Sequence, residues 1–357
     1  MADAGDATGV GYRAAGVDID AGAEAVRRIG PLVRSTYRPG VMGDIGGFGG
    51  LFDLARSGYR DPILVSATDG VGTKAEIARL TGRLDTIGRD LVAMCVDDLV
   101  CSGAAPLFFL DYLAVGRLDP EAVEQLVTGI AAGCSEAGCA LIGGEMAEHP
   151  GVMAADQFDL VGFAVGAVER EDVMDGSAAA PGDLLVAIDS PNLRSNGFSL
   201  ARRIVFDVAA RSLDDPAWEG SEGTLADELL APSVIYAAAV VAVLAAHEVH
   251  AVAHVTGGGL PGNLPRVLGE GVDAVVDPMA WEVPRIFREL QDMGGVSDAE
   301  MARVFNLGVG MVLVVPPSEA DGVVATLASG ARPARVIGEL VAGTGTVAYS
   351  GAGGMGS

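Results

Sequence analysis

The segment Ser66-Ala-Thr-Asp-Gly-Val-Gly-Thr-Lys74 decides the expected fold of this chain. It continues the apolar run Pro62-Ile-Leu-Val65, which is typical of a buried strand, and a helical pattern follows from Ala75 to Leu80. A strand that runs into a carboxylate, glycines and a lysine indicates an α/β unit that binds a metal-bridged phosphate. The segment is not a Walker A loop, because the GK[ST] ending is missing.

Lys74 is unusual in the composition of the chain. It is the only lysine, so the other 22 of the 23 basic residues are arginines. An ammonium is a compact point charge that a planar guanidinium does not replace at a phosphate. We therefore expect Lys74 to contact a phosphate, with a surface lysine left by chance as the alternative.

The overall composition excludes several classes of protein. The chain has 357 residues, a formal net charge of −25 and 50% hydrophobic residues. At ~100–200 residues per domain this length predicts two domains, and the negative charge argues against nucleic-acid binding. Four cysteines without a CxxC pair indicate reduced thiols in a cytoplasmic protein. The uncharged stretch 229–246 is predicted to be a buried, Ala-rich helix and not a membrane span.

Acidic residues follow several of the predicted elements in the first half. In the helix expected over 86–102, Asp98 falls on the apolar stripe, where a charge needs a partner or a metal. Asp97 and Asp90 fall on a neighbouring face, for which we expect solvation, although Asp97 is a plausible second ligand. Strands are expected at 106–113 and 140–146, and the latter ends at Glu145. Convergence of Asp69, Asp98 and Glu145 would suit Mg²⁺–triphosphate.

Glycine-rich loops supply the remaining candidates for ligand binding. Gly43-Asp-Ile-Gly-Gly-Phe-Gly-Gly50 holds five glycines in eight residues and is equally well explained as a hinge or as a ligand loop. Ser195 is predicted to cap a helix that runs to Phe206, and Thr256-Gly-Gly-Gly259 precedes a short helix; both helix starts could bind an anion. His250 and His254 share one face of a strand and are expected to be core or interface residues.

Several segments together resemble the phosphoribosylformylglycinamidine cyclo-ligases, also called AIR synthetases, from about residue 11 to residue 340. The resemblance rests on the following segments: Gly16-Val-Asp-Ile-Asp-Ala-Gly22, Ser66 to Lys74, Asp90-Leu-Val-Ala-Met-Cys-Val-Asp-Asp-Leu-Val100, Pro106-Leu-Phe-Phe-Leu-Asp-Tyr112, Gly143-Gly-Glu-Met-Ala-Glu148, Ser195-Asn-Gly-Phe-Ser-Leu200, His254-Val-Thr-Gly-Gly-Gly259 and Phe305-Asn-Leu-Gly-Val-Gly-Met311. Related folds share the acids and glycines but not this series.

The resemblance implies a fold and an activity. The fold is an α/β N-terminal half, 1–170, which carries the ATP and metal acids and pairs in a homodimer, and an α+β C-terminal half, 171–345. Residues 346–357 are expected to be a disordered, Gly-rich tail. The implied reaction converts formylglycinamidine ribonucleotide and ATP to aminoimidazole ribonucleotide, ADP and phosphate, with ATP bound without a P-loop. No nucleic-acid or membrane partner is expected.

The resemblance also implies the site residues. Lys74, Asp69 and Asp98 are the expected catalytic residues, and Mg²⁺ is expected on Asp69, Asp97, Asp98 and Glu145. ATP is expected to be bound by the following residues: Gly46, Gly47, Gly49, Gly50, Asp69, Gly70, Gly72, Thr73 and Lys74. The substrate is expected to be bound by the following residues: Ser195, Asn196, Gly197, Thr256, Gly257, Gly258, Gly259 and Asn263.

Three positions depart from the pattern that the chain resembles. Asp97 stands where the family usually has Asn, Arg194 where it commonly has His, and Gly30 near a position that is often basic. Two alternatives remain open, and these departures support the second of them. One is another ATP-dependent relative, such as thiamine-monophosphate kinase, selenophosphate synthetase or a hydrogenase-maturation protein, and the other is a silent nucleotide-binding paralogue.

Overall fold

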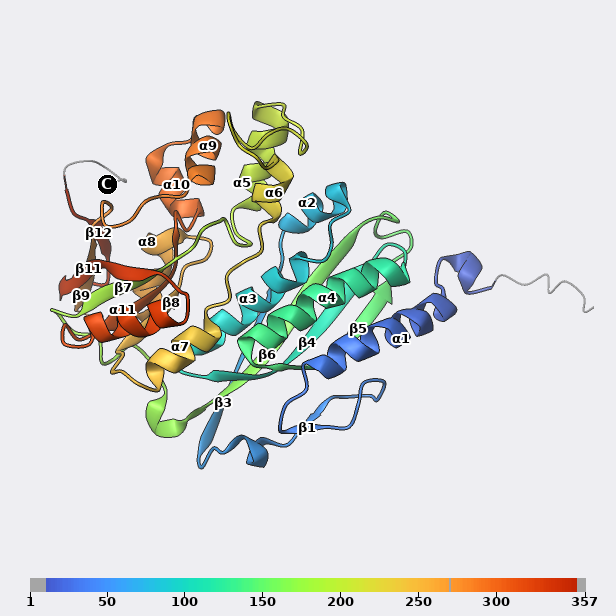
Figure 1. Ribbon diagram of the computed structural model, residues 1–357, viewed down its shortest axis with the longest axis horizontal. Coiled ribbons are helices and arrows are strands. Elements are labelled where there is room, and N and C mark those ends of the chain that lie inside the picture. The colour runs from blue at the N-terminus through green and yellow to red at the C-terminus, as the bar shows by residue number, and fades with distance from the viewer. Residues whose placement is uncertain (1–10, 270, 352–357) are drawn as a thin grey trace, which may run out of the picture.

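The N-terminal unit is a four-stranded sheet with helices packed on one face. The computed structural model describes residues 11–269 and 271–351, and Figure 1 shows its two α/β units side by side. Across the first sheet the strands are β3 (Pro62–Gly70), β6 (Phe158–Glu169), β4 (Ala105–Val115) and β5 (Ala140–Glu148). Only the β4–β5 pair is parallel. The helices of this unit are α1 (Ile19–Ser35), α2 (Lys74–Thr81), α3 (Ile87–Val100) and α4 (Pro120–Ala137), and a small hairpin is formed by β1 (Val41–Met42) and β2 (Leu51–Phe52).

The strand register places acids and glycines in one row across this sheet. Asp69 on β3 pairs with Gly162 on β6, and Gly162 pairs with Asp111 on β4. On its other side, Asp111 pairs with Gly144 on β5. Residues directly opposite each other in neighbouring strands project from the same face. A Cβ on Gly162 would collide with Phe109, Cys95 and Leu91, so this row faces the helices.

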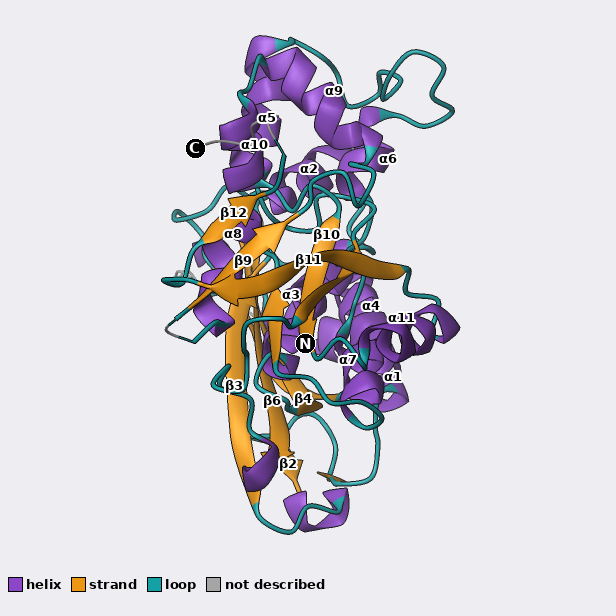
Figure 2. Ribbon diagram, turned by 90° about the vertical axis from the view of Figure 1, so that its left-hand side faces the viewer, coloured by secondary structure: helices purple, strands orange, loops and turns teal. Residues whose placement is uncertain are grey.

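The C-terminal unit is a six-stranded sheet with helices gathered around it. Its strand order is β12 (Val347–Tyr349), β9 (Val272–Val276), β11 (Ala334–Ala342), β7 (Leu184–Asp189), β10 (Val309–Val315) and β8 (Ala251–His254). All neighbours are antiparallel except β12 and β9. Its helices are α5 (Phe198–Arg202), α6 (Leu225–Leu230), α7 (Ala237–Leu244), α8 (Gly259–Asn263), α9 (Arg285–Gly294), α10 (Asp298–Val304) and α11 (Ala320–Ser329). Figure 2 shows α5, α6, α9 and α10 together at one end of the molecule.

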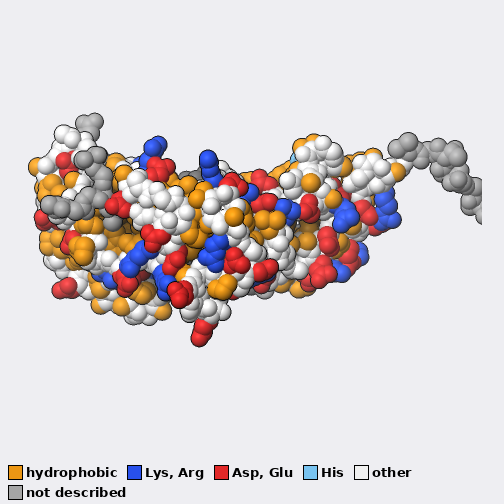
Figure 3. All heavy atoms as spheres, turned by 90° about the horizontal axis from the view of Figure 1, so that it is seen from above, with side chains coloured by type: hydrophobic (Ala, Val, Ile, Leu, Met, Phe, Trp, Pro, Cys, Tyr) orange, Lys and Arg blue, Asp and Glu red, His pale blue; other side chains and the backbone are white. Residues whose placement is uncertain are grey.

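One apolar core is continuous between the two units. Its buried side chains run from Ala25 in α1 through α3 and α4 to Val240 in α7 and Leu327 in α11. A second cluster covers the other side of the six-stranded sheet. Figure 3 shows acidic and basic side chains interspersed over one face of the surface, as expected for a folded chain with many carboxylates.

Three sequence predictions of local structure are wrong: the disordered tail, the continuous helix over 229–246 and the helix start at Ser195. Val347–Tyr349, assigned to a disordered tail, forms β12, while 352–357 lie outside the described residues. The single helix expected over 229–246 is interrupted between α6 and α7, because Pro232 lies there and the backbone N–H groups of Ser233 and Tyr236 donate to buried carboxylates of α3. Within the described ranges, no helix is long and apolar enough to span a bilayer.

The predicted helix start at Ser195 is also displaced. The helix begins at Phe198 with Gly197 at its N-cap, and Ser195 Oγ donates to the Val71 carbonyl oxygen, 2.8 Å away. Ser195 therefore joins the second unit to the loop after β3.

Candidate functional site

A cavity at the junction of the two units collects residues from both halves of the sequence. Its volume is about 360 Å³. It is lined by the following residues: Asp69, Gly70, Gly72, Met94, Asp159, Val161, Ser195 and Asn196. The structure thus brings together predicted ATP-side residues of the loop after β3 and predicted substrate-side residues of the loop before α5.

Asp69 and Asp98 form an acidic pair beside this cavity. Burial raises the pKa of Asp69, and the nearby negative charge of Asp98 raises it further, while the Gly70 N–H donates to the Asp69 carboxylate. Two carboxylates that repel each other in a partly desolvated place attract a divalent cation. Among the described residues, no group of three or more Asp, Glu, His or Cys side chains could hold a metal ion.

A buried chain of hydrogen bonds fixes the orientation of Asp98. His254 Nδ1 lies 2.7 Å from Asp98 Oδ1, and Arg194 Nη1 contacts His254 Nε2. Because a guanidinium can only donate, Nε2 is the accepting nitrogen and the imidazole proton is on Nδ1, which donates to Asp98. His254 is therefore a positioning residue. The sequence pattern predicted a core or interface residue, because its partners Asp98 and Arg194 lie on distant segments and no local pattern shows them.

The two neighbouring acids of α3 have the opposite environments to those predicted. The Asp97 side chain is completely buried, whereas that of Asp98 is 46% exposed. Asp97 Oδ1 accepts from the N–H groups of Tyr236 and Ala237 at 2.8 and 2.9 Å, and its other oxygen pairs with Arg194. Asp97 caps the start of α7 and is not available to a metal, because α7 covers the helix face that the periodicity left to solvent.

Lys74 does not contact the cavity. Its side chain is completely buried, and Nζ lies 2.8 Å from the Asp90 carboxylate and donates to the carbonyls of Arg194 and Ala231 at 3.0 and 2.8 Å. Burial lowers the pKa of Lys74, and the charge of Asp90 opposes that shift. The expected phosphate contact is therefore replaced by a structural one, in which three oxygens from both units saturate the ammonium.

Glu145 and the glycine loop belong to a second, larger cavity of about 620 Å³. Glu145 is on β5 and Asp69 on β3, at opposite edges of the four-stranded sheet, so the two acids are about 14 Å apart at ~4.8 Å per strand. The structure does not bring Glu145 to the Asp69–Asp98 pair. Gly46, Gly47, Gly49 and Gly50 line this cavity, and Gly50 must be glycine because a Cβ would lie 2.7 Å from the Ile142 carbonyl oxygen.

The triple-glycine turn lies beside the substrate-side loop. Gly257 faces Asn196, since a Cβ on Gly257 would lie 3.7 Å from Asn196 Oδ1. Asn263 is buried and its side-chain amide donates to the carbonyls of Thr256, Gly257 and Gly259, so it fixes the turn. Gly197 and Gly258 both have positive φ angles, and Thr73 Oγ1 lies 3.1 Å from Ser199 Oγ across the unit boundary.

The structure accounts for the three departures from the resembled pattern. Asp97 and Arg194 are partners in one buried ion pair, so a charge gained at one position is balanced at the other. At Gly30 the guanidinium of Arg34 occupies the space next to the backbone, 3.1 Å from where a Cβ would lie. A basic group is thus present beside position 30, supplied from one turn further along α1.

Comparisons with known proteins identify the family of the chain. Family models described as "AIR synthase related protein", N-terminal and C-terminal domains, match residues 57–168 and 180–350. A relative from Geotalea daltonii named phosphoribosylformylglycinamidine cyclo-ligase is 51% identical over 329 residues, which cover 92% of this chain and 94% of the relative.

Solved structures show the same fold at low identity. A thiamine-monophosphate kinase from Stenotrophomonas maltophilia superposes with a TM-score of 0.67 at 20% identity and covers 91% of this chain and 96% of its own. The hydrogenase maturation protein HypE in complex with ATP superposes with a TM-score of 0.64 at 17% identity, covering 91% and 88%. The expected two-domain AIR-synthetase fold is confirmed, and the chain belongs to the phosphoribosylformylglycinamidine cyclo-ligase family.

Proposed function

We propose that the chain catalyses the ATP-dependent ring closure of formylglycinamidine ribonucleotide to aminoimidazole ribonucleotide in purine biosynthesis. The observation that carries this proposal is 51% identity to a named cyclo-ligase over 92% of the chain. It is supported by the cavity in which Asp69, Gly70 and Gly72 meet Ser195 and Asn196. The alternative ATP-dependent relatives share the fold at about 20% identity or less.

The reaction has a simple chemical logic. An amide oxygen is a poor leaving group, so ATP transfers its terminal phosphoryl group to the formyl oxygen and ADP is released. The neighbouring nitrogen of the substrate then attacks the same carbon, the C–O bond breaks, and phosphate leaves as the ring closes. The protein's main contribution is to hold the two reactants together and to neutralise charge on the phosphoryl group.

We assign the phosphate side of the site to the loop after β3 and to the acidic pair. Asp69 and Asp98 fit Mg²⁺, because this ion takes one or two carboxylates and completes its shell with phosphate oxygens and water. When bound, Mg²⁺ would neutralise the charge of the phosphates. His254 keeps the Asp98 carboxylate oriented. The loop residues Gly70, Gly72 and Thr73 are assigned to ATP, and the Gly46–Gly50 loop to covering the nucleotide.

We assign the substrate side to the second unit. Ser195, Asn196 and Gly197 border the loop after β3, and Gly257 lies beside Asn196. Thr256, Gly258, Gly259 and Asn263 form or hold the adjoining turn. Because Ser195 and Asn196 line the same cavity as Asp69, a substrate held there would have its formyl oxygen near the transferred phosphoryl group. Lys74, Asp97 and Glu145 are not included, because their contacts lie elsewhere.

A homodimer is part of the proposal. The face of the four-stranded sheet opposite the helices carries large apolar side chains that remain exposed: Leu64, Tyr112, Val161 and Phe163. Such a patch on a soluble chain is typical of a protein interface.

A location in the reducing cytoplasm is also part of the proposal. It is consistent with the four cysteines, all of which are free thiols.

The test is turnover of the purified chain with formylglycinamidine ribonucleotide, ATP and Mg²⁺. We expect aminoimidazole ribonucleotide, measured by its diazo colour, to form in step with ADP. ADP without the imidazole would indicate another acceptor, and neither product would indicate the silent paralogue; both results contradict the proposal.

A further inference from the structure

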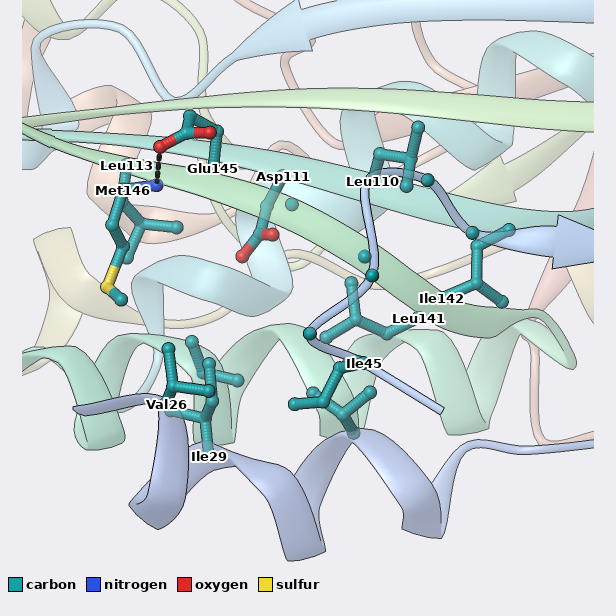
Figure 4. Close-up of a pocket in the computed structure, with 18 of the residues that line it drawn as sticks. Val26, Ile29, Ile45, Leu110, Asp111, Leu113, Leu141, Ile142, Glu145 and Met146 are labelled. Carbon is teal, nitrogen blue, oxygen red and sulfur yellow. Dashed lines mark hydrogen bonds between the residues drawn. The ribbon is translucent and has the colours of Figure 1, made fainter. Parts of the chain in front are cut away.

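The larger cavity contains a carboxylate that the proposed reaction does not use. This cavity lies between α1 and strands β4 and β5, and its volume of about 620 Å³ is within the usual range for small-molecule sites. Its walls are mainly apolar, with Val26, Ile29, Leu113 and Leu141 among the contributors. Figure 4 shows Asp111 projecting from β4 toward α1, whereas Glu145 lies on the other side of its strand.

Among the described residues, Asp111 is the acid of this cavity to which no other residue donates a hydrogen bond. Asp44 is bound by Arg34 at 3.0 Å and by the Tyr37 hydroxyl at 3.1 Å, and Glu145 accepts from the Met146 N–H. Within 11–269 and 271–351, no other residue donates a hydrogen bond to the Asp111 carboxylate. Burial raises the pKa of Asp111 to about 7.

Gly144 leaves room for the Asp111 carboxylate. Gly144 lies opposite Asp111 in the neighbouring strand, and a Cβ there would lie 1.8 Å from Asp111 Oδ1. Any other residue at Gly144 would push the carboxylate out of its position. The same sheet row contains Asp69 two strands away, about 10 Å at ~4.8 Å per strand.

A flat heteroaromatic ring with an N–H donor fits these surroundings. The apolar walls suit the ring faces, and the unpaired carboxylate needs a donor at its edge. The glycine loop that is assigned to covering the nucleotide borders the same cavity. Among the parts of ATP, the adenine base fits the apolar interior, and its 6-amino group is the donor. Guanine has an oxygen at this position, which the carboxylate repels when ionised.

We propose that Asp111 accepts a hydrogen bond from the 6-amino group of adenine and so selects ATP as the phosphoryl donor. This inference rests on the proposed function, because it assumes that ATP is the nucleotide bound. Asn at this position retains an acceptor oxygen of similar placement, whereas Leu has a similar shape and no acceptor. The two substitutions therefore separate the hydrogen bond from the packing.

The experiment compares nucleotides that differ by one group on the full-length protein. Binding of ATP, purine riboside triphosphate, GTP and 2′-deoxy-ATP is measured by calorimetry in the presence of Mg²⁺. We expect ATP to bind about tenfold more tightly than purine riboside triphosphate or GTP, the effect of about one buried hydrogen bond, and 2′-deoxy-ATP to bind like ATP. Asp111→Leu should abolish this preference. Asp111→Asn should keep the preference over purine riboside triphosphate, because its side-chain oxygen still accepts, and the control Asp44→Asn should keep both preferences.

The outcomes separate this inference from the proposed function. Equal binding of ATP and purine riboside triphosphate to the wild-type protein overturns the inference without any variant, so misfolding of Asp111→Leu does not matter. A preference that survives Asp111→Leu, or that depends on the ribose hydroxyl, also overturns it. If either occurs while the wild-type protein still closes the ring, only the inference fails. If the wild-type protein neither binds ATP nor turns over, the proposed function fails with it.

Discussion

The buried pair Asp97–Arg194 allows the sharpest test of how the two units are joined. Both side chains are completely buried, and Asp97 comes from α3 whereas Arg194 precedes α5. The perturbation is a double-mutant cycle of Asp97→Asn, Arg194→His and the double variant, which restores the pair usual in the resembled family.

The structure sets the expected magnitudes. Arg194→His leaves the Asp97 carboxylate buried without its guanidinium and should lower the free energy of unfolding by about 3–5 kcal/mol. Asp97→Asn keeps an oxygen for the Tyr236 and Ala237 N–H groups, so its cost should lie near the lower end, at about 3 kcal/mol. In the double variant no charge is unpaired. Its loss of unfolding free energy should therefore be smaller than the sum of the two single losses by about 2 kcal/mol or more.

The assay is urea unfolding followed by both fluorescence and circular dichroism, because agreement between the two probes tests for a single transition. A matched cycle on the solvent-exposed pair Glu24–Arg28 serves as control and should show no resolvable coupling. Additive costs at Asp97 and Arg194 would refute the reasoning, since they would mean that the two charges do not depend on each other.

Three further predictions follow from single contacts. Lys74→Met should lower the melting temperature, because it leaves Asp90 buried without its ammonium, and loss of activity at an unchanged melting temperature would instead return Lys74 to the phosphate site. Asp111→Asn should gain stability relative to wild type as the pH rises from about 4 to about 7, by at most about 4 kcal/mol, because a carboxyl whose pKa is raised in the folded state favours folding only while protonated. Equal pH dependence of urea unfolding in both proteins would contradict this. Phe163→Asp should convert a dimer to a monomer in light scattering after size exclusion, and an unchanged mass would exclude this sheet face as the interface.

The order of strands and helices was predictable because it depends on local patterns. Alternating or continuous apolar runs identified β3, β4 and β5, and the glycines at their ends marked the turns. The failures occurred where a distant segment changed the environment. Asp90 and Asp97 face outward by the periodicity of α3 alone, but residues 231–237 of the second unit cover them and donate N–H groups.

The candidate site was predictable only in part for the same reason. The loop after β3 and the Ser195–Asn196 loop carry recognisable motifs, and they meet at one cavity. The composition singled out Lys74 as the only lysine, but it did not show what this lysine binds. Its three partners are 16, 120 and 157 residues away in the sequence, so no local pattern shows them. Asp111 lies within an apolar strand, and its place in the cavity beside Gly144 depends on strand pairing, which no local pattern shows.

The central claim is that ring closure proceeds through phosphorylation of the formyl oxygen. The most direct measurement supplies formylglycinamidine ribonucleotide labelled with ¹⁸O at the formyl group and analyses the released phosphate by mass spectrometry. We predict one ¹⁸O atom in the phosphate for each aminoimidazole ribonucleotide formed, because the labelled oxygen leaves with the phosphoryl group. Unlabelled phosphate would show that water, and not the formyl oxygen, receives the phosphoryl group, and it would contradict the account.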